Sequence, residues 1–182
     1  MLLDFYPMRR IAFIFLTLML SGFALLPAQR LDQDIDGLAF LPMDSTRVQA
    51  LNRISEALLR DFPDSAMTFA AQAMSLGRKI NDASGQTWAR LNQARASIGR
   101  GDLDDASAAL KICESEFAQA HDMDGLAACI LATGQIALQQ KAWNATLAAC
   151  HKADSVLLVD TLMSPAPNLL RGKVFQELGN YD

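Results

Sequence analysis

The stretch from Gly125 to Ala153 constrains the fold of this chain more than any other part of the sequence. Its letters are GLAACILATGQIALQQKAWNATLAACHKA. Each half carries one stripe of small or apolar residues at helical spacing, which predicts two amphipathic helices joined by a tight turn. The stripes are Leu126, Ile130, Thr133 and Ala137 in the first half and Trp143, Leu147, Cys150 and Ala153 in the second. A single hairpin cannot bury both stripes, so the sequence predicts further hairpins stacked against this one.

A regular spacing indicates where the other hairpins lie. Ala66, Ala106 and Thr146 occupy the same place in successive second helices, one repeat length of about 40 residues apart, and we expect Thr146 to be buried. Gly134, where a neighbouring helix can approach closely, recurs as Gly172 at a similar interval. The pattern predicts about three and a half helical hairpins. The predicted repeats cover 45–82, 83–122, 123–160 and, as a partial unit, 166–182.

Composition supports an all-α fold and argues against binding to nucleic acid. Apolar residues make up 51% of the 182 residues and aromatic residues only 7%, which suits closely packed helices better than a β-sandwich. The formal net charge is −4, and the sequence contains no basic stripe that would attract a phosphate backbone. We therefore expect no nucleic acid partner.

Residues 1–28 have the order of a secretory signal peptide. Arg9 and Arg10 precede an apolar run from Ile11 to Leu20, and small residues follow this run. We expect export of the remainder to the periplasmic or extracytoplasmic side of a bacterial membrane. An uncleaved membrane anchor is the alternative, and it leaves the remainder on the same side.

The processing of this segment stays open in two respects. Translation can begin at Met1 or at Met8, and cleavage can follow Ala24 or Ala28. The acidic segment 29–44 comes next, and we interpret it as a linker that leads into the repeats.

The polar and sulfur-containing side chains do not form a recognisable catalytic or metal-binding motif. The three cysteines are Cys113, Cys129 and Cys150, whose spacing differs from that of zinc ligands, so we interpret them as small buried residues. One disulfide in an oxidising compartment is the alternative, and the sequence does not select the pair. His121 and His151 have no suitably spaced partners. We expect no catalytic residue, no metal site and no cofactor.

The third repeat resembles the tetratricopeptide repeats, in their variety of about 40 residues. Gly134 stands where that family keeps a small residue, Trp143 where it keeps an aromatic residue, and Ala153 where it keeps a second small residue. Thr146 departs from the family's alanine, and Lys141 begins a Lys-Ala pair where the family has Gly-Asp. The resemblance implies a right-handed α-α superhelix, that is, a TPR-like solenoid, over residues 44–182.

The partial fourth unit and the second repeat resemble the family to different degrees. The closest match is GKVFQELGNYD, through Gly172, Phe175, Leu178, Gly179 and Tyr181. The second repeat allows two registers. One is free of gaps and puts Ala94 in the place of the small residue, whereas the other aligns Trp88 and Leu91 and needs about two extra residues at the turn.

The first repeat resembles the opening repeat of exported bacterial sensors. Asp44-Ser45-Thr46-Arg47-Val48 matches their Asp-Ser/Thr-x-Arg-Val segment, and Asp44 or Ser45 offers a helix N-cap. The resemblance implies a truncated extracytoplasmic sensing part of a signalling protein, of the histidine kinase or transcriptional regulator type. A stand-alone periplasmic scaffold or adaptor protein is the alternative. Contact with the membrane is expected only through the N-terminal segment or a missing C-terminal anchor.

In such a solenoid the first helices form the concave wall, which holds a protein or peptide segment. The residues that the family's register places on this wall are Leu131, Gln135, Leu138, Gln139, Leu169, Lys173, Gln176 and Glu177. Trp88 and Arg95 join them in only one of the two registers. Apolar residues of the last helix lack a covering second helix, which predicts self-association through this exposed helix. These residues are Leu170, Val174, Phe175, Leu178 and Tyr181.

Overall fold

The structure is a computed structural model that describes residues 27–157 and 165–179. Every regular element in these two ranges is a helix, which confirms the predicted all-α class. Backbone contacts divide the chain into the units 1–39 and 40–182. The first unit contains α2 (Pro27–Gly37), and the 3-10 helix η1 (Leu38–Phe40) follows it, so the segment interpreted as a linker is partly helical. The predicted signal peptide, 1–28, lies outside the described residues except at positions 27 and 28.

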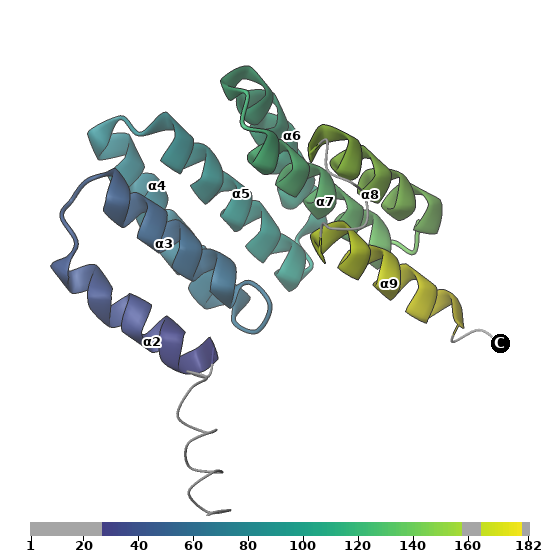
Figure 1. Cartoon of the computed structure of the whole chain (residues 1–182), viewed down its shortest axis with the longest axis horizontal. Coiled ribbons are helices and arrows are strands. Elements are labelled where there is room, and N and C mark those ends of the chain that lie inside the picture. Colours follow the sequence, from purple (N-terminus) through teal and green to yellow (C-terminus); the bar gives the residue numbers. More distant parts are fainter. Residues whose placement is uncertain (1–26, 158–164, 180–182) are drawn as a thin grey trace, which may run out of the picture. The chain divides into compact units, whose positions relative to one another are not determined.

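The described part of the second unit is a series of helical hairpins (Figure 1). Its helices are α3 (Ser45–Leu58), α4 (Pro63–Ile80), α5 (Ala83–Arg100), α6 (Leu103–Ala120), α7 (Met123–Gln139), α8 (Trp143–Leu157) and α9 (Pro165–Gly179). Consecutive helices pack against each other throughout this series. The repeat boundaries predicted after residues 82 and 122 fall between α4 and α5 and between α6 and α7. Tyr181 lies outside the described residues.

Five successive helices of the second unit begin at a constant interval of half a repeat. The first residues of five successive helices are Pro63, Ala83, Leu103, Met123 and Trp143. The turns before the last four contain one residue with positive φ each, namely Asn81, Gly101, His121 and Lys141. This left-handed conformation ends a helix and reverses the chain within a short turn. Each hairpin therefore has two arms of nearly equal length.

Aspartate side chains fix several of the helix starts. The side chain of Asp82 accepts a hydrogen bond from the backbone N–H of Gly85 at 2.8 Å, and that of Asp122 accepts one from Gly125 at 2.9 Å. Asp44 caps α3 in a similar way, which confirms one of the two predicted N-caps. These bonds satisfy backbone donors that the first turn of a helix leaves unpaired. Because Asp82 and Asp122 are one repeat apart, equivalent hairpins use the same cap.

The repeat spacing also holds in the core. Ala66, Ala106 and Thr146 each have an exposed fraction of 0%, which confirms the predicted burial of Thr146. The hydroxyl of Thr146 donates to the carbonyl oxygen of Ala142 at 3.2 Å and is thereby satisfied within its own helix. A Cβ added to Gly134 would lie 2.9 Å from the Cβ of Ala149, so the predicted close approach of a neighbouring helix is confirmed.

The three cysteines are buried free thiols in the core of the second unit, as predicted. Burial raises the pKa of the Cys150 thiol. A hydrogen bond with Cys113, together with burial, raises the pKa of Cys129, and the same hydrogen bond lowers the pKa of Cys113. These thiols behave as small core residues, as free cysteine commonly does.

The gap-free register of the second repeat is the one that the structure adopts. α5 and α7 begin one repeat apart, at Ala83 and Met123, so Ala94 of α5 is equivalent to Gly134 of α7. Both of these residues are buried. In this register Arg95 is equivalent to Gln135 and therefore belongs to the set of residues predicted for the wall.

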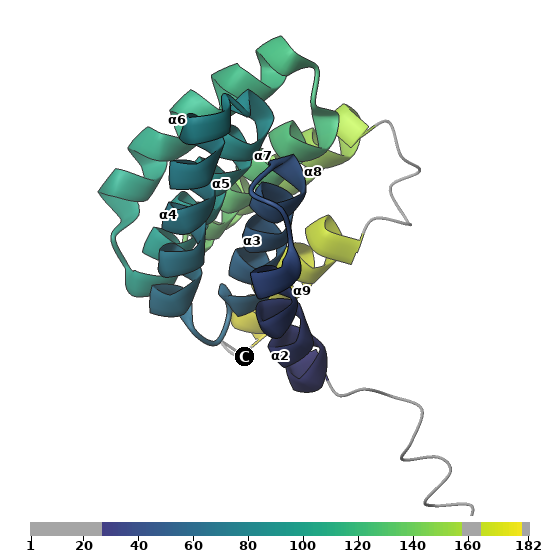
Figure 2. The ribbon, with the colours of Figure 1, turned by 90° about the vertical axis from the view of Figure 1, so that its left-hand side faces the viewer.

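First helices of successive hairpins lie closer together than second helices. Backbones of α3 and α5, of α5 and α7, and of α7 and α9 approach within 8 Å, whereas α4, α6 and α8 do not approach one another this closely along their described lengths. Figure 2 shows α4 and α6 on one side of the stack and α3 and α9 on the other. We name the surface formed by α3, α5, α7 and α9 the first-helix face.

Candidate binding surface

Two adjoining pockets hollow the first-helix face. The polar pocket lies between α3 and α5, has a volume of about 430 Å³, and is lined largely by polar side chains. Its lining residues are Ser45, Gln49, Asn52, Arg53, Glu56, Asp82, Ser84, Gly85, Trp88 and Asn92. Because most of them come from α3 and α5, the pocket belongs to the first-helix face.

The apolar pocket is the second hollow and lies where α3, α5, α7 and α9 converge. Its volume is about 230 Å³, and its lining is Glu56, Arg95, Ala128, Leu131, Ala132, Gln135, Ala166, Leu169, Leu170 and Lys173. Four first helices from successive hairpins thus contribute to one pocket. Alanine and leucine make up most of the lining, and the charged and amide side chains stand among them.

Glu56 lines both pockets, so the two adjoin, and we refer to them together as the groove. Its carboxylate accepts a hydrogen bond from the Arg95 guanidinium at 2.9 Å, across the gap from α3 to α5. The side chain of Arg95 is 23% exposed and that of Glu56 is 54% exposed. Solvent screens an ion pair of this kind, and such pairs contribute about 0.2–1 kcal/mol to stability. The pair therefore contributes little to the stability of the fold.

Two asparagines at the repeat interval tie α3 to α5 beneath the polar pocket. The amide nitrogen of Asn52 donates to the carbonyl oxygen of Gly85, and that of Asn92 donates to the carbonyl oxygen of Asn52, both at 3.0 Å. Asn52 is 8% exposed and Asn92 is 2% exposed. These bonds fix the orientation of both amides, and the two Oδ1 atoms remain buried without a hydrogen-bond partner among the described residues. Unsatisfied buried acceptors are unfavourable and rare in folded proteins.

The structure brings half of the residues predicted for the concave wall together and places the others elsewhere. Leu131, Gln135 and Lys173 line the apolar pocket, as does Leu169. Leu138 is half-buried and does not line either pocket. The amide of Gln139 donates to the carbonyl oxygen of Ile98 at 3.1 Å and so links α7 to the end of α5.

Gln176 and Glu177 are exposed on α9 outside both pockets. Sequence reasoning did not select the α3 side of the groove, which Asn52, Arg53 and Glu56 provide. One signal could have indicated part of it, because Asn52 and Asn92 are separated by one repeat length. Charge pairing between α3 and α5 leaves no local pattern in the sequence.

The apolar stripe predicted on the last helix is divided between the core and the surface. Leu170 and Val174 are buried, so they are not available for association with another chain. Phe175 is 63% exposed and Leu178 is 42% exposed. Burial of the first two residues is explained by the packing of α9 against both α7 and α8. The predicted self-association therefore depends on Phe175 and Leu178 among the described residues.

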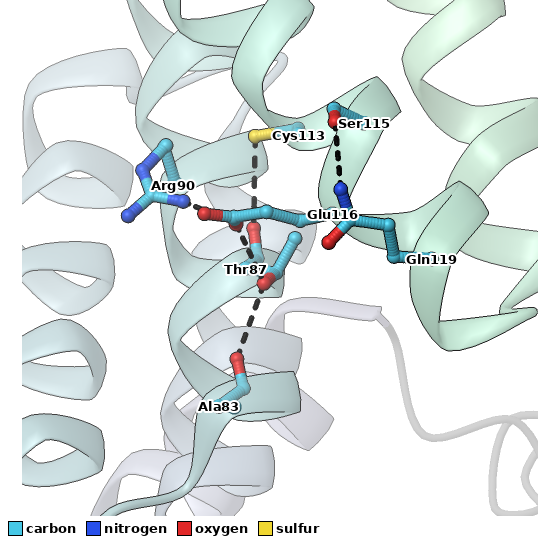
Figure 3. Close-up of polar contacts among 7 residues, drawn as sticks. All are labelled: Ala83, Thr87, Arg90, Cys113, Ser115, Glu116 and Gln119. Atoms are coloured by element: carbon cyan, nitrogen blue, oxygen red, sulfur yellow. Dashed lines mark hydrogen bonds and ion pairs between the residues drawn. The ribbon is translucent and has the colours of Figure 1, made fainter.

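A third pocket, of about 400 Å³, lies at the end of the α5–α6 hairpin, and its central polar groups pair with one another. Figure 3 shows this cluster: the hydroxyl of Thr87 lies 2.8 Å from the Glu116 carboxylate, and the Arg90 guanidinium forms an ion pair with the same carboxylate. The thiol of Cys113 donates weakly to the carbonyl oxygen of Thr87 at 3.9 Å. Because these bonds join α5 to α6, we regard the cluster as structural.

Over the described residues, the geometry defines a class of protein: stacked helical hairpins with two adjoining pockets on the first-helix face. Comparison of the chain with protein-family models, with curated proteins and with solved structures yields no match. The described residues contain no cluster of histidine, cysteine, aspartate or glutamate side chains that could hold a metal ion. Within the same ranges, no helix is both long and apolar enough to cross a membrane.

Proposed function

We propose that the chain is a helical-repeat binding module whose first-helix face holds an extended peptide or a segment of another protein. The observation that carries this proposal is the pair of adjoining pockets on the first-helix face, which share Glu56 and draw side chains from four helices. Extended inner surfaces of repeat proteins commonly hold partners of this kind. The resemblance to tetratricopeptide repeats supports the same function. We propose on the same basis that the hairpins form a right-handed superhelix. Binding would require no chemistry from the module itself.

The buried amide oxygens of Asn52 and Asn92 also support an extended partner. A peptide backbone presents N–H donors at regular intervals, and these two acceptors recur at the repeat interval beneath the polar pocket. The oxygens are covered in the free chain, so a donor reaches them only after the covering side chains move. Side-chain rearrangement at an interface is common when a partner binds.

The binding test changes the charge of the groove without altering the core. In the variant Gln135→Glu with Lys173→Glu, both substitutions lie at the apolar pocket. The matched control is Gln72→Glu with Lys111→Glu, which makes the same charge change at exposed sites on the second helices α4 and α6. Partners captured by the unaltered chain should be lost with the first variant and kept with the control. Equal capture by all three proteins would refute binding in the groove.

We further propose that the module works on the extracytoplasmic side of a bacterial membrane, as the sensing part of a signalling protein. The signal-peptide pattern of residues 1–28 and the segment from Asp44 to Val48 support this proposal. Fusion of residues 1–44 to alkaline phosphatase, an enzyme that is active only after export, should give an active enzyme. An inactive fusion would contradict the location and leave the binding proposal intact.

A further inference from the structure

The apolar pocket is the part of the groove whose chemistry specifies an occupant most narrowly. Its volume of about 230 Å³ lies below the range of roughly 300–1,000 Å³ that accommodates a drug-sized ligand or cofactor. Such a pocket suits one or two side chains. Its lining consists mainly of aliphatic or methyl groups, which are Ala128, Leu131, Ala132, Ala166, Leu169 and Leu170. Leu169 is 66% exposed in the free chain, so covering it with an apolar side chain would remove hydrophobic surface from water.

The charged side chains that line this pocket carry a net positive charge. Its charged lining residues are one acid, Glu56, and two bases, Arg95 and Lys173. Glu56 and Arg95 pair with each other. Within the described part of the chain Lys173 forms no ion pair, and Glu177, one turn further along α9, forms none with it either. The pocket therefore combines an aliphatic lining with one uncompensated cation, although the whole chain is acidic.

We propose that the apolar pocket accepts an aliphatic side chain from a bound peptide and that Lys173 binds a carboxylate close to that side chain. This inference rests on the proposed function, and it names the class of peptide: a segment in which leucine-like residues and acidic residues are neighbours. The aliphatic group replaces water over Leu131 and Leu169, and the carboxylate neutralises the unpaired ammonium group. A basic segment would instead place like charges against Lys173, which the groove disfavours.

The test uses the full chain and three short labelled peptides in fluorescence polarisation. The first peptide contains leucine and glutamate in a background of glycine and serine. In the second peptide glutamine replaces glutamate, and in the third peptide serine replaces leucine. The first peptide should bind most tightly, and its affinity should fall as salt is added, because salt screens the charge pair.

Three variants then assign the two contacts. Lys173→Glu should weaken binding of the first peptide roughly five- to tenfold, since an attractive charge pair becomes repulsive. The affinity for the glutamine peptide should not change. Leu169→Ser, at an exposed position, should weaken binding of the first peptide and leave the affinity for the serine peptide unchanged. Lys111→Glu on α6 is the charge control and should change none of the three affinities.

The outcomes separate this inference from the proposed function. Equal binding of the glutamate and glutamine peptides, or full binding to Lys173→Glu, would overturn the acidic specificity while the groove remained a binding site. Tighter binding of a fourth peptide, in which lysine replaces glutamate, would overturn it as well. The binding function itself would be refuted if no peptide bound and if the variant Gln135→Glu with Lys173→Glu captured the same partners as the unaltered chain.

Discussion

Gly125→Ala tests most sharply how closely the hairpins are stacked. A Cβ at this position would lie 2.3 Å from Cδ1 and 2.4 Å from Cε1 of Phe117, the residue of α6 against which the start of α7 packs. Ordinary contacts of a Cβ begin at 3.4 Å, so the ring and the helix must separate by about 1 Å. Phe117 has little freedom to move, because it is 2% exposed and its ring packs edge-on against Trp88 at a centroid distance of 5.1 Å.

The expected cost follows from these contacts. Overpacking of a well-filled core costs about 1–3 kcal/mol, and the gain in helix propensity from glycine to alanine offsets at most about 1 kcal/mol of it. We expect the free energy of unfolding to fall by about 1–2 kcal/mol, which corresponds to a decrease of roughly 2–8 °C in Tm for a chain of this size. Urea denaturation followed by far-UV circular dichroism measures the change.

The matched control is Gly172→Ala in α9. A Cβ at Gly172 meets nothing within 4 Å, and the residue lies in a helix interior, so alanine should preserve or slightly raise stability. Stability of Gly125→Ala equal to or above that of the unaltered chain would refute the close packing of α7 on Phe117. A loss of stability in Gly172→Ala would show that the space around α9 is not open.

Three further predictions concern the last helix and the thiols. Arg171→Ala removes the ion-pair partner of the Asp154 carboxylate, whose side chain is 3% exposed. The packing of α9 against α8 should therefore weaken by about 3 kcal/mol, and the backbone amides of α9 should lose their protection from hydrogen exchange. Unchanged protection would contradict this. Ellman's reagent should react with none of the three buried cysteines until the chain unfolds, and rapid reaction of any one would contradict their burial. Light scattering should show self-association that Phe175→Glu abolishes, since Phe175 is 63% exposed; a monomeric unaltered chain would refute it.

Local sequence signals predicted the helices and the repeat length for identifiable physical reasons. Asp44 caps a helix through its own side chain, and a buried small residue recurs at the repeat interval in the second helices, as at Ala66 and Ala106. Gly101 adopts the left-handed conformation that a tight turn favours. Asn81 adopts the same left-handed conformation in the turn half a repeat earlier. The similarity of these two turns is evident from their backbone angles and not from their residue types.

Contacts between hairpins were less predictable, because they join residues that lie far apart in the sequence and share no local pattern. The Glu56–Arg95 pair spans 39 residues, and nothing near either residue indicates the other. The place of Gln139 in the repeat predicts a position on the wall, but its amide donates to the end of α5. Clustered aspartates and a glycine favour a linker where the structure has the helix α2. Sequence therefore located groove residues on α7 and α9 and none on α3.

Mapping of backbone amide shifts by NMR during a peptide titration tests the central claim most directly. The isotope-labelled full chain is titrated with the peptide that contains leucine and glutamate. We predict that the shift changes concentrate on α3, α5, α7 and α9, around Asn92, Leu131, Gln135 and Lys173, and that α4, α6 and α8 change little. Shift changes that concentrate on α4, α6 and α8, or none at saturating peptide, would contradict a binding groove on the first-helix face.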